Sequence, residues 1–360
     1  MSSDREDQRL AFLKCAGLAA ARRQVLAGDA STRRYERLYP NAGPSLILMD
    51  QPPSVETQPC PPNADETTRR SLGLNALERL AAGRVDAFVA CAGYLTSLEL
   101  SAPQIVAADA PAGFAVLEDL GDGVFARMIQ EGLDAAPLYA AATDVLVALH
   151  AQPPPKTLGG VWPLLDYDAL ALKTAGDFFI DWMPKLIPAL YFSDSARAEW
   201  DALWAPIHQR AADGACVFCH RDYHAENLLW LPQRTGQQRV GLLDFQDAVR
   251  AHPAWDLSLL LHDARRQVSP ELEAAVLQRY LDARPHLDPV EFRTDFHALG
   301  ALNILRILGK FARLITHAGK PRYRDYMPRM WAYLDRCLID PAPPHLAVWV
   351  ATHVPERLRA

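Results

Sequence analysis

Three polar side chains between residues 222 and 244 have the types and the spacing that a phosphoryl-transfer site requires. Asp222 is followed five residues later by Asn227, and Asp244 stands 17 residues further on, behind a short apolar run. A carboxylate can orient a hydroxyl group and accept its proton during attack on the γ-phosphate of ATP, whereas Mg²⁺ on the phosphates prefers hard oxygen ligands. We therefore predict that Asp222 acts on the hydroxyl and that Asn227 and Asp244 bind Mg²⁺.

Short apolar runs around these residues predict the strands that position them. The runs cover residues 217–219, 228–230 and 240–243, and runs of this length between polar turns are typical of buried strands. Polar side chains at strand ends can converge on one site. Two ordinary acidic turns are the alternative, and we favour the site because three positions match together.

The cysteines suggest a different metal site. Cys216, Cys219, His220 and His224 offer four ligands within nine residues, and many zinc sites begin with a Cys-x₂-Cys pair. All four lie in one strand and its loop, where alternate side chains point to opposite faces, and no second pair follows. We expect no zinc here, and the scattered positions of the six cysteines predict reduced thiols.

Composition indicates a cytoplasmic enzyme. The 360 residues suit two domains, half of them are hydrophobic, and the net charge is −6. No run of Lys and Arg exceeds two residues, so we expect no nucleic-acid partner. The first residues are too charged for a secretory signal, and no apolar stretch reaches the roughly 18 residues of a membrane span.

A turn near the N-terminus predicts phosphate contacts. Residues 25–38 indicate a strand, a turn of small residues and a second strand. Backbone groups at Ser31 and Thr32 could approach a phosphate closely, and Arg33 or Arg34 could add positive charge.

The remaining N-terminal elements predict a small sheet. Residues 45–50 and 113–121 indicate further strands, and residues 86–98 have helical composition. The proline-rich and polar segment 51–84 predicts a loop or an insertion.

The C-terminal half predicts helices. Ser269 and Asp288 are each followed by proline and glutamate, which is typical of helix starts, and the second helix should end near His317. On that helix one polar stripe consists of Asn303, Arg306, Lys310 and Arg313. The stripe could be a solvated face, or Arg306 could meet an anionic substrate.

The segment His220-Arg-Asp-Tyr-His-Ala-Glu-Asn227, with Asp244 and Asp256 beyond it, resembles the aminoglycoside phosphotransferase and choline kinase group of the protein-kinase-like fold. Arg221 stands where this group usually has glycine. The resemblance implies an α+β, bilobal protein-kinase-like fold. A small antiparallel β-rich lobe would cover residues 1–120 and bind nucleotide, and a larger, mainly helical catalytic lobe would cover residues 121–360.

The same resemblance implies ATP and Mg²⁺ as cofactors and assigns further roles. Backbone groups of Glu118 and Leu120 would bind adenine, and His220 and Asp256 would support the catalytic loop. Met49 stands where a phosphate-binding lysine is usual. A non-catalytic pseudokinase that only binds ligand is therefore one alternative.

Other segments resemble a narrower group, the bacterial anomeric kinases of N-acetylmuramate and N-acetylglucosamine, which make sugar 1-phosphates during peptidoglycan recycling. They are residues 28–35, 46–53, 116–122, 307–314 and 319–323. The likeness implies an amino sugar as the small-molecule substrate, and His224, Glu226 and Arg306 are candidates for contacting it. We expect a monomer or a weak dimer. The alternative substrate is a non-anomeric hydroxyl of an aminoglycoside or an amino alcohol.

Overall fold

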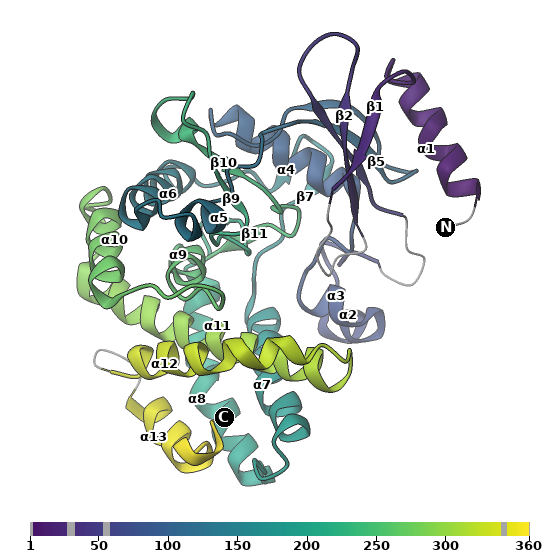
Figure 1. The fold of residues 1–360 in the computed structure, drawn as a ribbon. Coiled ribbons are helices and arrows are strands. Elements are labelled where there is room, and N and C mark those ends of the chain that lie inside the picture. Colours follow the sequence, from purple (N-terminus) through teal and green to yellow (C-terminus); the bar gives the residue numbers. More distant parts are fainter. Residues whose placement is uncertain (1–2, 27–32, 53–57, 340–343, 360) are drawn as a thin grey trace. The chain divides into compact units, whose positions relative to one another are not determined.

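A computed structural model describes residues 3–26, 33–52, 58–339 and 344–359, which divide into two compact units (Figure 1). The first unit consists of Met1–Leu133, Pro155–Leu164 and Glu226–Ala248. The second consists of Asp134–Pro154, Leu165–Ala225 and Val249–Ala360. The predicted boundary at residue 120 lies inside the first unit, and the assignment of a nucleotide-binding lobe to residues 1–120 stays a prediction.

An antiparallel five-stranded sheet forms the centre of the first unit, in the order β1-β2-β3-β5-β4. Its strands are β1 (Arg22–Val25), β2 (Arg34–Tyr39), β3 (Leu46–Asp50), β4 (Ile105–Asp109) and β5 (Phe114–Glu118). The strands predicted around the N-terminal turn, at 45–50 and at 113–121 are thereby confirmed. The turn residues Ser31 and Thr32 lie outside the described part of the chain.

Helix α1 (Ser3–Cys15) packs on this sheet through both apolar and charged contacts (Figure 1). Phe12 stacks on Phe114 of β5 with ring centroids 5.4 Å apart. The buried carboxylate of Asp50 accepts hydrogen bonds from Arg5 Nε at 3.0 Å and Arg9 Nε at 3.2 Å. Two arginines on one carboxylate compensate its burial, so the ion pairs fix the helix against β3.

Two short helices occupy the segment for which a loop was predicted. They are α2 (Glu66–Leu72) and α3 (Leu74–Leu77). Asp65 accepts a hydrogen bond from the backbone N–H of Thr68 at 2.8 Å and so caps α2. Buried Arg69 donates to the carbonyl oxygens of Ala76 at 3.2 Å and of Leu77, which ties the two helices together. Of the two predicted alternatives, a loop was wrong for these residues, because a buried arginine replaces the apolar stripe that identifies most helices, and an insertion stays a prediction.

The other elements of the first unit follow the sheet. They are α4 (Val85–Ser97), α5 (Phe125–Gln130), β6 (Thr157–Leu158), β7 (Trp162–Pro163), β9 (Leu228–Trp230), η1 (Gly236–Arg239) and β10 (Val240–Leu242). The helix predicted at 86–98 is thereby confirmed as α4. Strands β9 and β10 pair antiparallel, with Leu242 opposite Leu228.

The second unit is mainly helical, as predicted. Its elements are α6 (Ala135–Leu149), α7 (Ala169–Leu186), α8 (Asp194–Asp213), β8 (Val217–Cys219), β11 (Val249–Ala251), α9 (Ala254–Leu261), α10 (Pro270–Asp282), α11 (Pro289–Thr316), η2 (Pro321–Tyr326), α12 (Met327–Cys337), α13 (Pro344–His353) and η3 (Glu356–Leu358). The predicted α+β class, with an antiparallel sheet first and helices after it, is confirmed.

The long helix α11 is central to the second unit (Figure 1). Asp288 caps it by accepting the backbone N–H groups of Val290 and Glu291, each at 2.9 Å, as the sequence predicts. Helix α7 approaches at Gly309, where an added Cβ would lie 2.3 Å from the carbonyl carbon of Phe178. Only glycine allows the two backbones to touch there, so α11 is held against α7 at this residue.

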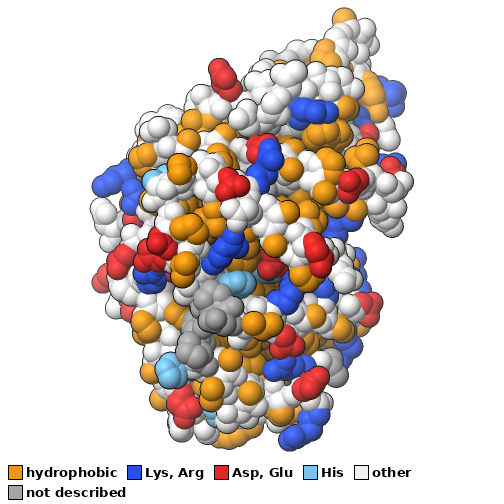
Figure 2. All heavy atoms as spheres, turned by 90° about the vertical axis from the view of Figure 1, so that its left-hand side faces the viewer, with side chains coloured by type: hydrophobic (Ala, Val, Ile, Leu, Met, Phe, Trp, Pro, Cys, Tyr) orange, Lys and Arg blue, Asp and Glu red, His pale blue; other side chains and the backbone are white. Residues whose placement is uncertain are grey.

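Charged side chains of both signs lie on the surface (Figure 2), and no membrane span is found among the described helices. Figure 2 shows one face, on which the basic side chains drawn in colour are interspersed with acidic ones. None of the described helices combines the length and the apolar character that a membrane span requires.

Candidate active site

A buried carboxylate holds the loop that carries Asp222. Strand β8 ends at Cys219, and the loop begins at His220. Asp256 of α9, with 1% of its surface exposed, accepts the backbone N–H groups of His220 at 2.6 Å and of Arg221 at 2.9 Å. These are the bonds that the predicted supporting role of Asp256 requires, and the role itself stays a prediction.

Burial is the largest influence on the pKa values of Asp256 and of its neighbour Cys219. It raises the pKa of the Asp256 carboxyl above its ordinary value, against the charge of His220 and the backbone hydrogen bonds, which act in the opposite direction. Burial and the neighbouring Asp256 also raise the pKa of the Cys219 thiol well above its ordinary value. A thiol that stays protonated, 3.1 Å from Asp256 Oδ1, is a poor zinc ligand.

Arg221 explains why glycine is usual at its position. Its φ angle is +73°, a left-handed conformation that costs a non-glycine residue about 1–2 kcal/mol. The bond from its N–H to Asp256 offsets this strain. So does the contact of its guanidinium with the ring of Tyr167, whose centroid lies 4.6 Å away.

Asp222 lies between two buried neighbours. Arg221 and Tyr223 are buried, whereas Asp222 is partly exposed. The hydroxyl of Tyr223 donates to the carbonyl oxygen of Ala142 at 2.8 Å, and the backbone N–H of His224 donates to the Asp222 carbonyl oxygen at 3.0 Å. The loop is thus anchored on both sides of the residue that we predict to act on the acceptor hydroxyl.

The first unit brings Asn227 and Asp244 together. Asn227 directly precedes β9, and Asp244 comes two residues after the end of β10. Since these strands run antiparallel, the start of one meets the end of the other, and the Leu243 N–H donates to the Asn227 carbonyl oxygen at 3.0 Å. The amide of Asn227 and the carboxylate of Asp244 are hard oxygen donors of the kind that Mg²⁺ accepts.

Arg33 contacts the predicted metal ligand. Its Nη1 donates to Asp244 Oδ1 and to Gln246 Oε1, each at 2.9 Å. The side chain of Arg33 is 12% exposed and that of Asp244 is 41% exposed. Burial by itself would lower the pKa of Arg33, but Tyr35 and Asp244 outweigh it and raise that pKa above its ordinary value. Asp244 has a φ of +61°, so strained backbone occurs here as well as at Arg221.

Arg33 and Arg34, the two candidates for replacing the usual lysine, differ in their position relative to Met49. Met49 is buried on β3, opposite Tyr35, and lines a small cavity together with Arg33 and Gln246. Arg34 is exposed at the start of β2, with its Cα paired to that of Asp50. Arg33 therefore lies beside Met49, and its role as the replacement for the usual lysine stays a prediction.

The segment predicted to bind adenine packs on β10. An added Cβ at Gly241 would lie 3.2 Å from Leu120 Cδ1, so glycine permits this close approach. The N–H of Glu118 already donates to the Gln104 carbonyl oxygen at 2.8 Å. The Glu118 carboxylate pairs with Arg234, a residue that the sequence did not single out.

The three predicted sugar contacts differ in exposure. His224 is partly exposed in the second unit, and Glu226 is exposed in the first. Arg306 of α11 is buried, as is Asn303 one turn earlier, whereas Arg313 is exposed. A solvated face is therefore the wrong interpretation for Arg306 and Asn303.

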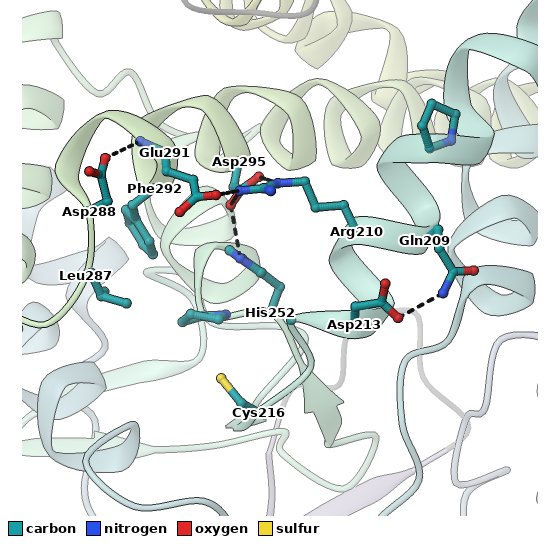
Figure 3. Close-up of a pocket in the computed structure, with 13 residues that line it drawn as sticks. Gln209, Arg210, Asp213, Cys216, His252, Leu287, Asp288, Glu291, Phe292 and Asp295 are labelled. Carbon is teal, nitrogen blue, oxygen red and sulfur yellow. Dashed lines mark hydrogen bonds and ion pairs between the residues drawn. The ribbon is translucent and has the colours of Figure 1, made fainter.

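The second unit also contains a cavity of about 700 Å³, and none of the predicted site residues lines it. Figure 3 shows Arg210 extending from α8 towards Glu291 and Asp295 of α11. The arginine pairs with Glu291 at 2.8 Å and with Asp295 at 2.9 Å, and His252 Nε2 lies 3.4 Å from Asp295. Arginine, histidine and carboxylates thus satisfy one another in the wall of the cavity.

Comparison with known proteins agrees with the resemblance seen in the sequence. The model of the phosphotransferase enzyme family (APH) matches residues 22–292. The chain is 61% identical to the N-acetylmuramate/N-acetylglucosamine kinase of Caulobacter vibrioides, over 100% of this chain and 99% of that protein.

Two solved structures share the fold at low identity. Choline kinase LicA from Streptococcus pneumoniae gives a TM-score of 0.53 at 16% identity, covering 95% of this chain and 99% of that one. The ADP-bound aminoglycoside phosphotransferase APH(2'')-Ib gives 0.52 at 12% identity, covering 93% and 97%. The predicted protein-kinase-like fold is confirmed.

Proposed function

We infer the activity of this chain from its family: it belongs to the phosphotransferase enzyme family, and it is a kinase. We propose that it transfers the γ-phosphoryl group of ATP to the C1 hydroxyl of N-acetylmuramate and N-acetylglucosamine. The products would be sugar 1-phosphates, formed during peptidoglycan recycling. The observation that carries this proposal is the 61% identity, over the full length, to a kinase named for those two sugars.

Asp222 is the residue that we assign to the acceptor. The C1 oxygen attacks the γ-phosphorus, the bond from that phosphorus to the departing ADP oxygen breaks, and the proton of the hydroxyl passes to the Asp222 carboxylate. A hemiacetal hydroxyl is more acidic than an ordinary alcohol. Orientation and late acceptance of the proton are therefore enough, and the partly exposed carboxylate of Asp222 suits them.

Asn227 and Asp244 are the residues that we assign to Mg²⁺. Their oxygens are of the right type, they stand at neighbouring strand ends, and the Asp244 carboxylate is accessible at 41% exposure. The ion would neutralise charge on the nucleotide phosphates. Arg33, beside Asp244, would add a fixed positive charge for the same phosphates, and the backbone at Glu118–Leu120 would receive adenine.

We also propose that the enzyme works in the cytoplasm on a small amino sugar, as a monomer or a weak dimer and without nucleic acid or membrane. All six cysteines are free thiols, which suits a reducing compartment. ATP as the phosphoryl donor points to the same place.

Methyl glycosides test the anomeric assignment. N-acetylmuramate and N-acetylglucosamine should consume ATP, whereas their methyl glycosides, identical except for the blocked C1 oxygen, should not. Phosphorus coupling to the anomeric carbon in the NMR spectrum of the product would locate the new bond. The selected anomer keeps its configuration because the acceptor oxygen stays on the sugar, and we expect that anomer to be α.

Two results would contradict the proposal. Phosphorylation of the methyl glycosides would place the acceptor elsewhere on the ring. Turnover only with kanamycin-like or choline-like acceptors would favour the non-anomeric alternative, and nucleotide binding without turnover of any acceptor would favour a pseudokinase.

A further inference from the structure

Arg306 is a buried cation without a carboxylate. It lies on α11 and is 8% exposed. Its Nε and Nη2 both donate to Asn303 Oδ1, at 3.0 Å and 2.8 Å. These are its only hydrogen bonds within the described residues, where it forms no ion pair. Buried charges in proteins are normally paired with an opposite charge or with several acceptors, whereas the acceptor of Arg306 is a single amide oxygen.

Two neutral donors beside Arg306 also lack acceptors. Asn303 is 0% exposed and Trp255 is 1% exposed. Neither Asn303 Nδ2 nor Trp255 Nε1 has a hydrogen-bond partner among the described residues. Since Arg306 occupies Asn303 Oδ1, the amide must present its Nδ2 as a donor. Most buried polar atoms are satisfied, so adjacent unsatisfied donors call for an explanation.

The donors form one cluster. Arg306 Cζ lies 5.7 Å from the ring centroid of Trp255, and Asn303 is bonded to Arg306. The cluster, which we call the donor cluster, consists of Arg306, Asn303 and Trp255. It combines the positive charge of Arg306 with two neutral N–H donors, Asn303 Nδ2 and Trp255 Nε1. Asn303 Oδ1, the acceptor of the amide, is already bonded to Arg306. Such a set fits an anion with at least two oxygens, above all a carboxylate, which a guanidinium can bind with two parallel hydrogen bonds.

The donor cluster connects to the catalytic loop within the second unit. Trp255 precedes Asp256, whose carboxylate holds the backbone of His220 and Arg221. The ring of Trp255 also contacts Tyr167 at a centroid distance of 4.9 Å, and Tyr167 in turn contacts Arg221 at 4.6 Å. A substrate whose hydroxyl is at Asp222 would therefore have the donor cluster in its neighbourhood.

Arg210 provides the contrast within the same unit. It too lies near α11, yet it is neutralised by both Glu291 and Asp295 (Figure 3). The helical unit thus satisfies Arg210 with acids, and it satisfies the buried Arg284 with the carbonyl oxygen of His150. Arg306 departs from this pattern although it is more deeply buried than Arg210.

We propose that the donor cluster is a carboxylate subsite that recognises the lactyl group of N-acetylmuramate. This rests on the proposed function, because it assumes that both sugars present C1 to Asp222. The two substrates differ at this substituent, which N-acetylglucosamine lacks. The donor cluster therefore sets the preference for the acidic sugar and is not needed for phosphoryl transfer itself.

The test compares kcat/KM for the two sugars in matched variants. Arg306→Met keeps the apolar stem and removes the charge, and it should lower kcat/KM for N-acetylmuramate about 10- to 100-fold, the usual effect of a lost charge-assisted hydrogen bond. N-acetylglucosamine should change less than about threefold, because it has no carboxylate to lose. Arg313→Ala, an exposed cation on the same helix, should leave both values unchanged.

Asn303→Asp separates recognition from support of the fold. It places a carboxylate beside Arg306, which should preserve or improve packing while it neutralises the guanidinium and repels the substrate carboxylate. We expect the same selective loss for N-acetylmuramate. If Arg306→Met does not fold, this variant and Arg306→Lys, which retains charge and should retain part of the preference, decide the matter.

The outcomes distinguish the subsite from the proposed function. If both sugars are phosphorylated but their kcat/KM ratio stays constant in Asn303→Asp and Arg306→Met, the subsite is wrong and the function stands. An equal loss for both sugars would assign the cluster to structure alone. If the unaltered enzyme consumes ATP with neither sugar, the proposed function itself fails.

Discussion

Replacing Arg33 with methionine would show whether this residue performs the task of the usual lysine. Methionine keeps an apolar chain beside Met49 and removes the guanidinium that contacts Asp244 and Gln246. Arg34→Met is the matched control. That residue is the next one along the chain and is exposed at the start of β2.

The structure predicts different sizes for the effects on folding and on catalysis. The Asp244 side chain is 41% exposed and can be hydrated when its partner is lost. The pair should therefore contribute no more than about 1 kcal/mol to the free energy of unfolding, as is usual for accessible ion pairs. A charge-assisted contact to phosphate is worth about 1.5–3 kcal/mol, which corresponds to about a 10- to 150-fold loss of kcat/KM for ATP.

The assay measures ATP kinetics at saturating sugar, with urea unfolding as the stability control. We expect a large loss of kcat/KM for ATP in Arg33→Met, a change below about twofold in Arg34→Met, and nearly equal unfolding free energies. The Mg²⁺ concentration at half-maximal rate gives a second readout, because Arg33 shares an oxygen with the predicted metal ligand.

A specific result would refute the reasoning. If Arg33 merely neutralises Asp244, its removal should make Mg²⁺ bind more tightly and raise the rate at limiting Mg²⁺, while the KM for ATP stays constant. That pattern would mean that the nucleotide is held by other groups.

Two predictions concern carboxylates of the candidate site. Asp222→Asn should abolish single-turnover phosphoryl transfer and spare nucleotide binding in calorimetry, whereas Asp244→Ala should remove Mg²⁺-dependent nucleotide binding; near-normal turnover in Asp222→Asn would contradict the role of the base. Asp256→Asn should lower the free energy of unfolding by about 1–3 kcal/mol, because its amide nitrogen leaves a buried backbone N–H unsatisfied. The pKa of Asp256 is raised in the folded state, so its contribution to the free energy of unfolding falls as the pH rises from the ordinary carboxyl pKa to the pKa in the folded protein. Urea unfolding at several pH values should show this slope for the unaltered protein and not for Asp256→Asn.

The strands and helix ends could be predicted because their signals are local. The runs at 217–219, 228–230 and 240–243 are short, apolar and bounded by polar residues, and the structure forms a strand at each, the last of them at Val240–Leu242. Asp288 and the proline after it identify the start of α11 for the same reason. The helices at 66–77 were not predicted, because the residue that stabilises them is a buried arginine and not an apolar stripe. Arg69 donates to carbonyl oxygens that come within its reach only in the folded chain.

The long-range parts of the site could not be predicted. That Asn227 and Asp244 stand at strand ends follows from the sequence, but the register that places them side by side does not. The contact of Arg33 with Asp244 joins residues 211 positions apart. Helical periodicity places Arg306 on a polar stripe, yet periodicity does not reveal that Trp255 lies beside it and that it is buried.

The contact of α11 with α7 at Gly309 restricts how this enzyme can acquire a new acceptor. Phe178 leaves no room for even a methyl group there, so the helix cannot slide or rotate to suit a differently shaped sugar without separating the two backbones. Arg306 and Asn303 lie within two turns of this fixed point. Diversification of substrate choice, in evolution or in a mutant library, should therefore proceed by exchanging side chains while the helix keeps its contact with α7, and positions 303 and 306 are where such a library should begin.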